Sequence, residues 1–230
     1  MCLIVVAHRV SDRFPLVIAA NRDEEYARPT RPAHWWEDAP DVLGGRDLRH
    51  GGSWLAITRS GRVAAVTNLR GASKPDAPSR GILVRDFVMS NEDPLAYARG
   101  IRKEDYAGFH LIAGEIGGTF VHLAGELREW TRGIHGVSNG PADARWEKID
   151  RAVDYMRDAL RIDDPLLLAQ DIVAFLGIAT SDEIERTVFV ATQRYGTRSS
   201  TAIVATAGEI VFVEKSYGDS DGTRTFRITR

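Results

Sequence analysis

The residue best suited to do chemistry is Cys2, the single cysteine of the 230-residue chain, which follows Met1 and heads the apolar run LIVVAH. Methionine aminopeptidases commonly remove a start methionine that precedes a residue as small as cysteine. The exposed α-amine has a reference pKa of about 7.7–8.0, so the same residue would carry a thiol nucleophile and a base. The alternative is that Cys2 is a small buried hydrophobe, as most free cysteines are.

Further polar residues stand where apolar runs stop. Functional groups are often held in this way, on loops that a rigid sheet positions. Taken singly, each has an ordinary explanation, because asparagine and aspartate are common in turns and helix caps. Together with a strand that begins at a thiol, they predict one site. These residues are Asn21, Arg22, Asp23, Asn68, Asn139 and Arg198, of which Asn21, Arg22 and Arg198 are expected to bind substrate.

The set suits acyl transfer, which needs a nucleophile, a base, an orienting acid and donors aimed at the developing oxyanion. Cys2 would attack, and Asp23 would hold its amine or thiol. Asn68 and Asn139 carry neutral amide donors, while Arg198 carries a charge suited to an anionic substrate group. We therefore expect Cys2 to begin a central strand, Asp23 to leave the neighbouring strand, and all five residues to share one cleft.

The elements that must position these residues begin with two paired strands, LIVVAH and FPLVIAA. The proline-rich stretch ARPTRPAHWWEDAP is expected to be a long surface loop. GGSWLAITRSGRVAAVTNLRG predicts two strands joined at RSGR. RGILVRDFVMSNEDPLAYARGIRK predicts two helices, of which the second is capped by Asp93 and starts at Pro94.

The second half of the chain repeats this order of strands and helices. FHLIAGEIGGTFVHLAGELREWTRG predicts a three-stranded meander, DARWEKIDRAVDYMRDAL and DPLLLAQDIVAFLG predict two helices, and TVFVAT, STAIVATAGEIVFVEKS and TRTFRIT predict strands. The apolar stripe of the first of these helices is Trp146, Ile149, Val153, Met156 and Leu160. Helix pairs grouped between buried strands predict an α+β fold, a four-layer α-β-β-α sandwich.

Composition excludes several classes of function. A net charge of −2 gives no argument for nucleic acid or an anionic membrane as partner. The apolar runs are too short for a membrane helix, and the start lacks the basic region of a secretory signal. A lone cysteine suits a reducing compartment, so a cytoplasmic protein is expected. The six histidines show no zinc-binding spacing, so no metal is expected.

The motifs resemble those of the NRDE family, also called the transport and Golgi organisation protein 2 family. The resemblance covers almost the whole chain: MCLIV, AANRDEEYARPT, GGSWLAI, AAVTNLRG, GVSN before a helix, and YGTRSSTAIV. NRDE placed just after a strand that begins at Cys2 is specific in combination. The resemblance implies a single family domain over residues 1–230.

That family is similar in turn to N-terminal-nucleophile hydrolases of the choloylglycine hydrolase and penicillin V acylase type, which cleave amides with an N-terminal cysteine and have the α-β-β-α fold. The resemblance implies that Cys2 is the nucleophile and that Asp23 matches the aspartate of their Arg-x-x-Asp motif. Asn68 and Asn139 look like their two substrate-side asparagines, and Arg198 resembles their late arginine.

One position departs from that pattern. The arginine of the motif falls on Ala20, and Arg22 lies beside Asp23 instead. Because neighbouring strand residues point to opposite faces, we expect Arg22 to point away from the site; pointing inward, it would replace the lost arginine.

The functional expectation is therefore a hydrolase of a small amide or acyl substrate without a cofactor. Eukaryotic members of the family are linked with Golgi organisation, mitochondrial lipid metabolism and haem trafficking without an agreed reaction. The alternative is a non-catalytic carrier of haem or an acyl-CoA-like ligand. His8 and His122 are then the candidate axial ligands of haem.

Overall fold

A computed structural model describes residues 2–142, 144 and 146–230 of the chain. The chain divides into two compact units, each built on one antiparallel sheet. Unit 1 comprises Met1–Ala27, Arg132–Ser138 and Asp143–Arg230, and unit 2 comprises Arg28–Thr131 and Asn139–Ala142.

Unit 1 contains a six-stranded sheet in the order β10-β1-β2-β11-β12-β13, in which every neighbouring pair is antiparallel. The first two strands pair with each other, as the sequence predicted, and their outer partners come from much later in the chain. The strands are β1 (Leu3–His8), β2 (Leu16–Glu25), β10 (Gly133–Val137), β11 (Tyr195–Ala205), β12 (Glu209–Ser216) and β13 (Gly222–Thr229).

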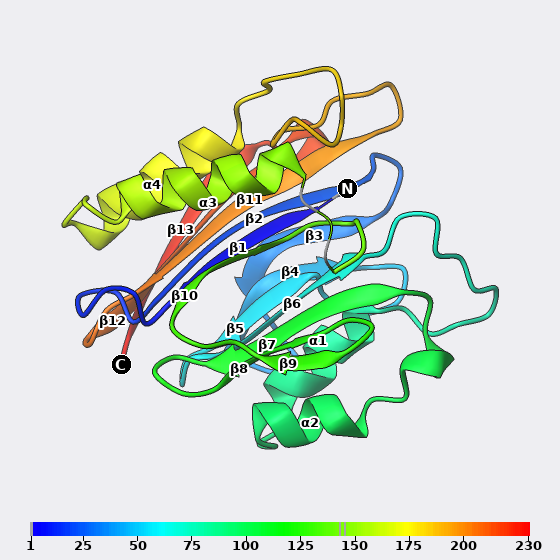
Figure 1. The fold of residues 1–230 in the computed structure, drawn as a ribbon, viewed down its shortest axis with the longest axis horizontal. Coiled ribbons are helices and arrows are strands. Elements are labelled where there is room, and N and C mark those ends of the chain that lie inside the picture. The colour runs from blue at the N-terminus through cyan, green and yellow to red at the C-terminus, as the bar shows by residue number, and fades with distance from the viewer. Residues whose placement is uncertain (1, 143, 145) are drawn as a thin grey trace. The chain divides into compact units, whose positions relative to one another are not determined.

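Helices α3 (Glu147–Ala159) and α4 (Pro165–Leu176) lie along one face of this sheet (Figure 1). Asp164 caps α4 by accepting from the backbone N–H groups of Leu166 and Leu167, which satisfies donors that a helix start leaves unpaired. The core between helices and sheet is aliphatic. It includes Leu3, Val5, Ala7, Val17, Ala19, Met156, Leu168, Ile172, Ala202 and Val204.

Unit 2 contains a seven-stranded antiparallel sheet whose strands follow one another in chain order from β3 to β9. The predicted hairpin at RSGR and the predicted three-stranded meander both form within it. The strands are β3 (Thr30–Trp35), β4 (Val42–Asp47), β5 (Leu55–Thr58), β6 (Arg62–Asn68), β7 (Phe109–Glu115), β8 (Phe120–Leu123) and β9 (Leu127–Glu129).

Helices α1 (Gly81–Met89) and α2 (Pro94–Gly100) pack against the strands of unit 2 and enclose its core around Phe87. The predicted break between them is confirmed, because Asp93 accepts from the backbone of Leu95 and Ala96 and Pro94 opens the second helix. Short 3-10 turns complete the two units at Lys103–Asp105 and Gly218–Ser220.

Two expectations about the elements are wrong, and one strand is not predicted. The proline-rich stretch expected as a loop contains β3, where Pro32 is tolerated because β3 is an edge strand. VLGGRD, for which the sequence predicts no element, forms β4. TVFVAT forms no strand beyond an isolated bridge between Ala191 and Gly196. Asp143 and Arg145, at the start of the segment predicted as a helix, lie outside the described residues.

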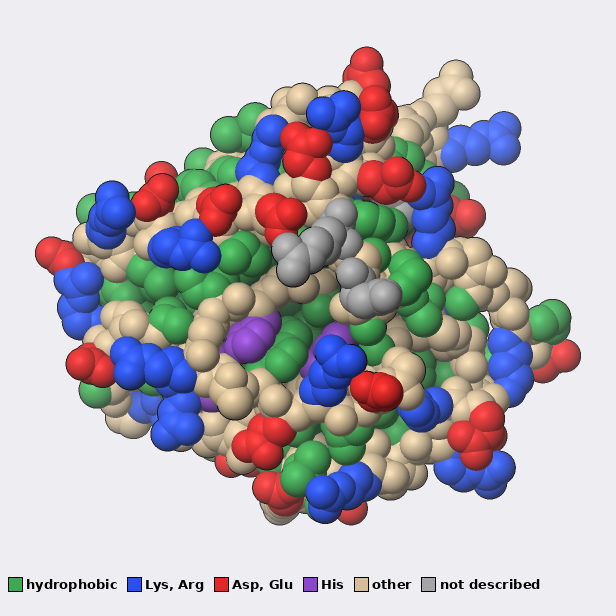
Figure 2. Space-filling model, viewed as in Figure 1, with side chains coloured by type: hydrophobic (Ala, Val, Ile, Leu, Met, Phe, Trp, Pro, Cys, Tyr) green, Lys and Arg blue, Asp and Glu red, His purple; other side chains and the backbone are tan. Residues whose placement is uncertain are grey.

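Among the described residues, no helix combines the length and the apolar character needed to cross a membrane. Basic and acidic side chains are interspersed over the face seen in Figure 2, which therefore carries no extended patch of a single sign.

Candidate active site

Cys2 lies in unit 1 directly before β1, which is an interior strand between β10 and β2. Ser138 Oγ, just beyond β10, donates to the Cys2 carbonyl at 2.6 Å, and the half-buried Cys2 thiol donates to the Asp23 carbonyl at 3.8 Å. Residues next to β10 on one side and in β2 on the other therefore hold Cys2 in place. Met1, whose removal the sequence reasoning requires, lies outside the described residues.

The surroundings of Cys2 favour the neutral thiol. Burial raises its pKa above the ordinary value, the charge of Asp23 raises it too, and the charge of Arg22 lowers it. A thiol is a weak nucleophile until it loses its proton. Catalysis at Cys2 therefore requires a base, as the sequence reasoning assumed.

Asp23 is 5% exposed and lies within β2, which runs on through the NRDE residues to Glu25 instead of ending before them. The strand is this long because β11 pairs with it from Leu16 to Glu25. Thr197 Oγ1 of β11 donates to Asp23 Oδ1 at 2.7 Å and accepts from the Val190 N–H at 2.9 Å. The carboxyl group is thus fixed in place from the adjacent strand.

The pKa of the Asp23 carboxyl is raised by burial, against which the Thr197 hydrogen bond and the charge of Lys148 act to lower it. Neither Thr197 nor Lys148 was found from the sequence. Thr197 belongs to the motif YGTRSSTAIV and directly precedes Arg198. Lys148 lies in a helix whose predicted core-facing residues are all apolar.

Arg22 points to the face of the sheet opposite to Asp23, as strand alternation predicts, but the register of β1 and β2 gives this same face to Cys2. Leu3 pairs with Asn21, so the same register continued by one residue puts Cys2 opposite Arg22. The Arg22 side chain is 5% exposed, and its Nη2 lies 3.8 Å from Glu24 Oε2. The charge of Arg22 lowers the pKa of the Cys2 thiol. Ala20 faces the same side, two residues back. The charge nearest to Cys2 on that face is therefore that of Arg22.

Asn21 points to the helix-covered side and its amide is engaged at both ends. Nδ2 donates to the Leu176 and Val188 carbonyls, each at 2.9 Å, and Oδ1 accepts from Ser200 Oγ at 2.6 Å. The residue is 1% exposed. These contacts tie β2 to the end of α4, so they favour a structural role for Asn21 over the substrate-binding role expected from the sequence.

Arg198 occupies a bulge within β11, where the pairing with β2 shifts between Thr197 and Ser199. The expectation that it precedes the strand is wrong, since β11 begins at Tyr195. Its Nη1 donates to the Glu25 carbonyl at 3.0 Å and the Tyr26 carbonyl at 2.8 Å. This guanidinium therefore fixes the chain as it leaves β2.

Asn68 and Asn139 belong to unit 2, and the structure brings them together. Asn68 is the last residue of β6, and its carbonyl accepts from Asn139 Nδ2. The Asn139 carbonyl in turn accepts from the Arg70 N–H at 2.7 Å. Asn139 is 4% exposed, and its Oδ1 is buried without a hydrogen-bond partner among the described residues. That these amides serve the Cys2 thiol stays a prediction.

A buried histidine pair supports the Asn139 loop. His110 Nε2 donates to the Gly140 carbonyl at 2.8 Å, which leaves Nδ1 to accept from His122 Nε2 at 2.9 Å. The two rings stack with centroids 5.2 Å apart. Burial lowers the pKa of His110 below its ordinary value, so this side chain is held neutral.

Acidification is expected to destabilise the protein through His110. The pKa of His110 is lower in the folded state than in the unfolded state. His110 therefore contributes stability that is complete above the unfolded pKa of about 6.5 and is lost as the pH falls from there to the folded pKa. His110→Gln should therefore lose less stability than wild type between pH 7.5 and pH 5 in urea denaturation. The exposed His50→Gln is the control. An equal loss in wild type and His110→Gln would contradict the prediction.

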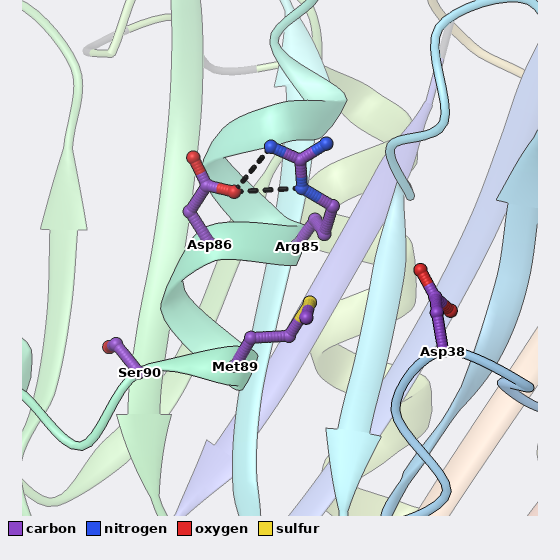
Figure 3. Close-up of a pocket in the computed structure, with 5 residues that line it drawn as sticks. All are labelled: Asp38, Arg85, Asp86, Met89 and Ser90. Atoms are coloured by element: carbon purple, nitrogen blue, oxygen red, sulfur yellow. Dashed lines mark hydrogen bonds and ion pairs between the residues drawn. The ribbon is translucent and has the colours of Figure 1, made fainter.

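A surface pocket of about 430 Å³ lies elsewhere on unit 2 and contains no residue of the candidate site (Figure 3). Its charges are paired with one another or with neighbours: Arg85 Nε donates to Asp86 Oδ1 at 2.8 Å, and Asp38 accepts from Arg46. We assign it no chemistry.

Solved structures share the fold of this chain. A variant of the conjugated bile acid hydrolase from Clostridium perfringens superposes with a TM-score of 0.57 at 9% identity, covering 98% of this chain and 92% of that one. A Caenorhabditis elegans N-acylethanolamine-hydrolyzing acid amidase ortholog gives a TM-score of 0.51 at 11% identity, covering 88% and 92%. The protein thus has the predicted α+β fold of N-terminal-nucleophile hydrolases.

Sequence relatives identify the family. The family model described as Transport and Golgi organisation 2 matches residues 1–219. The Transport and Golgi organization protein 2 homolog of Bos taurus is 33% identical, covering 92% of this chain and 90% of that protein, and the Homo sapiens homolog is 30% identical, covering 94% and 93%. The chain belongs to the Transport and Golgi organisation 2 family.

Proposed function

We propose that this protein is an N-terminal-nucleophile-type hydrolase that cleaves a small amide or acyl substrate through Cys2. The observation that carries the proposal is the position of Cys2 at the start of an interior strand, with its thiol hydrogen-bonded to the Asp23 main-chain carbonyl. The fold shared with an amidase and a bile acid hydrolase supports it.

In the proposed reaction, the α-amine exposed by removal of Met1 takes the thiol proton, and the thiolate attacks the substrate carbonyl carbon. The tetrahedral oxyanion collapses and expels the leaving amine or thiol, which receives the proton. Water then hydrolyses the acyl–Cys2 thioester, which releases the acyl group as a carboxylic acid and restores the thiol. Asp23, held by Thr197, orients the amine, and Arg22 favours the thiolate.

The deciding experiment is intact-mass spectrometry of protein purified from its own host, followed by reaction with a thiol-reactive acyl probe. We expect the mass of the chain without Met1, and one added acyl group. Because Cys2 is the single cysteine, any thiol label reports on it alone. A chain that retains Met1 has no free amine on Cys2, and this result would exclude the mechanism.

A non-catalytic carrier is the second candidate, and two observations favour it. Ala20 stands where the hydrolases resembled carry an arginine, and burial keeps the Cys2 thiol neutral. For a haem carrier, His8 and His122 are poor axial ligands: they are 2% and 6% exposed, and His122 Nε2 is bonded to His110. Burial also lowers the pKa of His8 to about 4. Titration with haem, followed by its Soret band, tests this version, which requires a saturable shift at micromolar haem.

A further inference from the structure

Lys148 is a fully buried lysine on the sheet-facing side of α3, in unit 1. Its exposed fraction is 0%, and it shares the buried stripe of the helix with Ala152, Met156 and Ala159. These partners are apolar or small, so the lysine occupies a position that packing alone would give to a hydrophobic residue.

The topology puts Lys148 at the Cys2 end of the sheet. β10 is antiparallel to β1 and pairs Val137 with Ile4, so it ends beside the start of β1. Helix α3 begins after that end and runs back over β10 and β1, with Ile149 packed against Gly136. The first turn of α3, which carries Lys148, therefore lies near the strand ends that hold Cys2 and Asp23.

Asp23 points toward the same side of the sheet. Strand alternation places it with Ala19, a residue of the core that α3 and α4 cover, and opposite to Arg22. The charge of Lys148 acts on Asp23 and lowers its pKa. Two described groups of unit 1 act on the Asp23 carboxyl: Thr197 on β11 donates to Oδ1, and Lys148 on α3 acts through its charge.

A cation at this position is costly on two counts. A buried ammonium loses its hydration, and the N-terminal turn of a helix carries a partial positive charge that disfavours it. The Trp146 ring, with its centroid 5.3 Å from Nζ, offsets part of this cost. A nearby buried carboxylate offsets far more, because the opposite charge acts at low local dielectric.

We propose that Lys148 is the charge partner of Asp23: a positioning residue that keeps the carboxylate ionised beside Cys2. The ionised carboxylate can then hold a protonated α-amine on Cys2, so the purpose of the pair rests on the proposed function. The pairing itself is a property of the folded protein and can be measured without any substrate.

The test is a carbon-13 NMR titration of the Asp23 carboxyl, whose resonance is assigned by its absence from Asp23→Asn. In Lys148→Met, loss of the cation should raise the pKa of Asp23 by about one unit or more, a tenfold change in its ionisation equilibrium. Lys148→Arg keeps a positive charge at this position and should therefore titrate like the wild type. Arg151→Met, which removes an exposed cation one turn along the same helix, is the matched control and should leave it unchanged.

The melting temperature of a double variant gives a second measurement, which can be made even if one single variant is too unstable for the NMR titration. Asp23→Asn alone removes the negative charge that stabilises the buried cation, so adding Lys148→Met to it should raise the melting temperature. An unchanged Asp23 titration in Lys148→Met, or a double variant that melts below Asp23→Asn, would overturn the pairing. Failure to find hydrolysis, with both results as expected, would count against the proposed function alone.

Discussion

Cys2→Ala is expected to abolish turnover of any amide or thioester substrate, lowering kcat by about a thousandfold or more, because removing a nucleophile removes the whole covalent route. Steady-state kinetics on a panel of acyl amides and acyl thioesters measures the effect. The fold should be unaffected, since alanine fits a half-buried position that cysteine occupies.

Cys2→Ser is the matched variant, because it keeps a hydroxyl in place of the thiol. It should retain ligand binding and lose most of the turnover, since a serine hydroxyl is a weaker nucleophile than a thiolate. A carrier predicts something different, namely ligand binding that survives Cys2→Ala and no turnover in any variant. Turnover that persists in Cys2→Ala would refute a role for the thiol as nucleophile.

Asn21→Ala is expected to destabilise the protein by about 2 kcal/mol, because it leaves two buried carbonyls without a donor, each at a cost of roughly 1 kcal/mol or more. The carbonyls are those of Leu176 and Val188, while the Ser200 hydroxyl, which also bonds to Asn21, keeps its hydrogen bond to the Tyr217 hydroxyl. The free energy of unfolding from urea denaturation measures it.

The exposed Asn91→Ala serves as the control, with an expected change within about 0.5 kcal/mol, as for most surface substitutions. If Asn21→Ala unfolded at the same urea concentration as wild type but lost substrate affinity, then Asn21 would bind substrate, as the sequence reasoning expected.

Apolar pattern and caps were sufficient to predict most elements, but not those that depend on packing between neighbours. β4 carries Gly44 and Gly45, which read as a loop. A Cβ on Gly44 would lie 2.6 Å from the Leu55 carbonyl, and one on Gly45 would meet the Trp54 ring. These glycines exist because other groups approach the strand closely, which no local pattern reveals.

The candidate site was predictable in its motif residues and not in their supports. Cys2 and Asp23 are predicted from their types and spacing, and in the structure the Cys2 thiol donates to the Asp23 main-chain carbonyl. Thr197 and Lys148 act on Asp23 from β11 and α3. Such partners depend on tertiary pairing, and a lysine within an amphipathic helix reads as part of its solvated face.

The outer neighbours of β1 and β2 in the sheet, β10 and β11, are synthesised long after them, which affects when the sheet can form. β2 cannot gain its β11 partner until roughly 170 residues more have been translated. At about 5–20 residues per second, that interval is roughly 10–30 s. During it, the nascent amino terminus stays outside a finished sheet and within reach of a ribosome-associated aminopeptidase. The removal of Met1 that the proposed function requires is thus expected to precede completion of the sheet around Cys2.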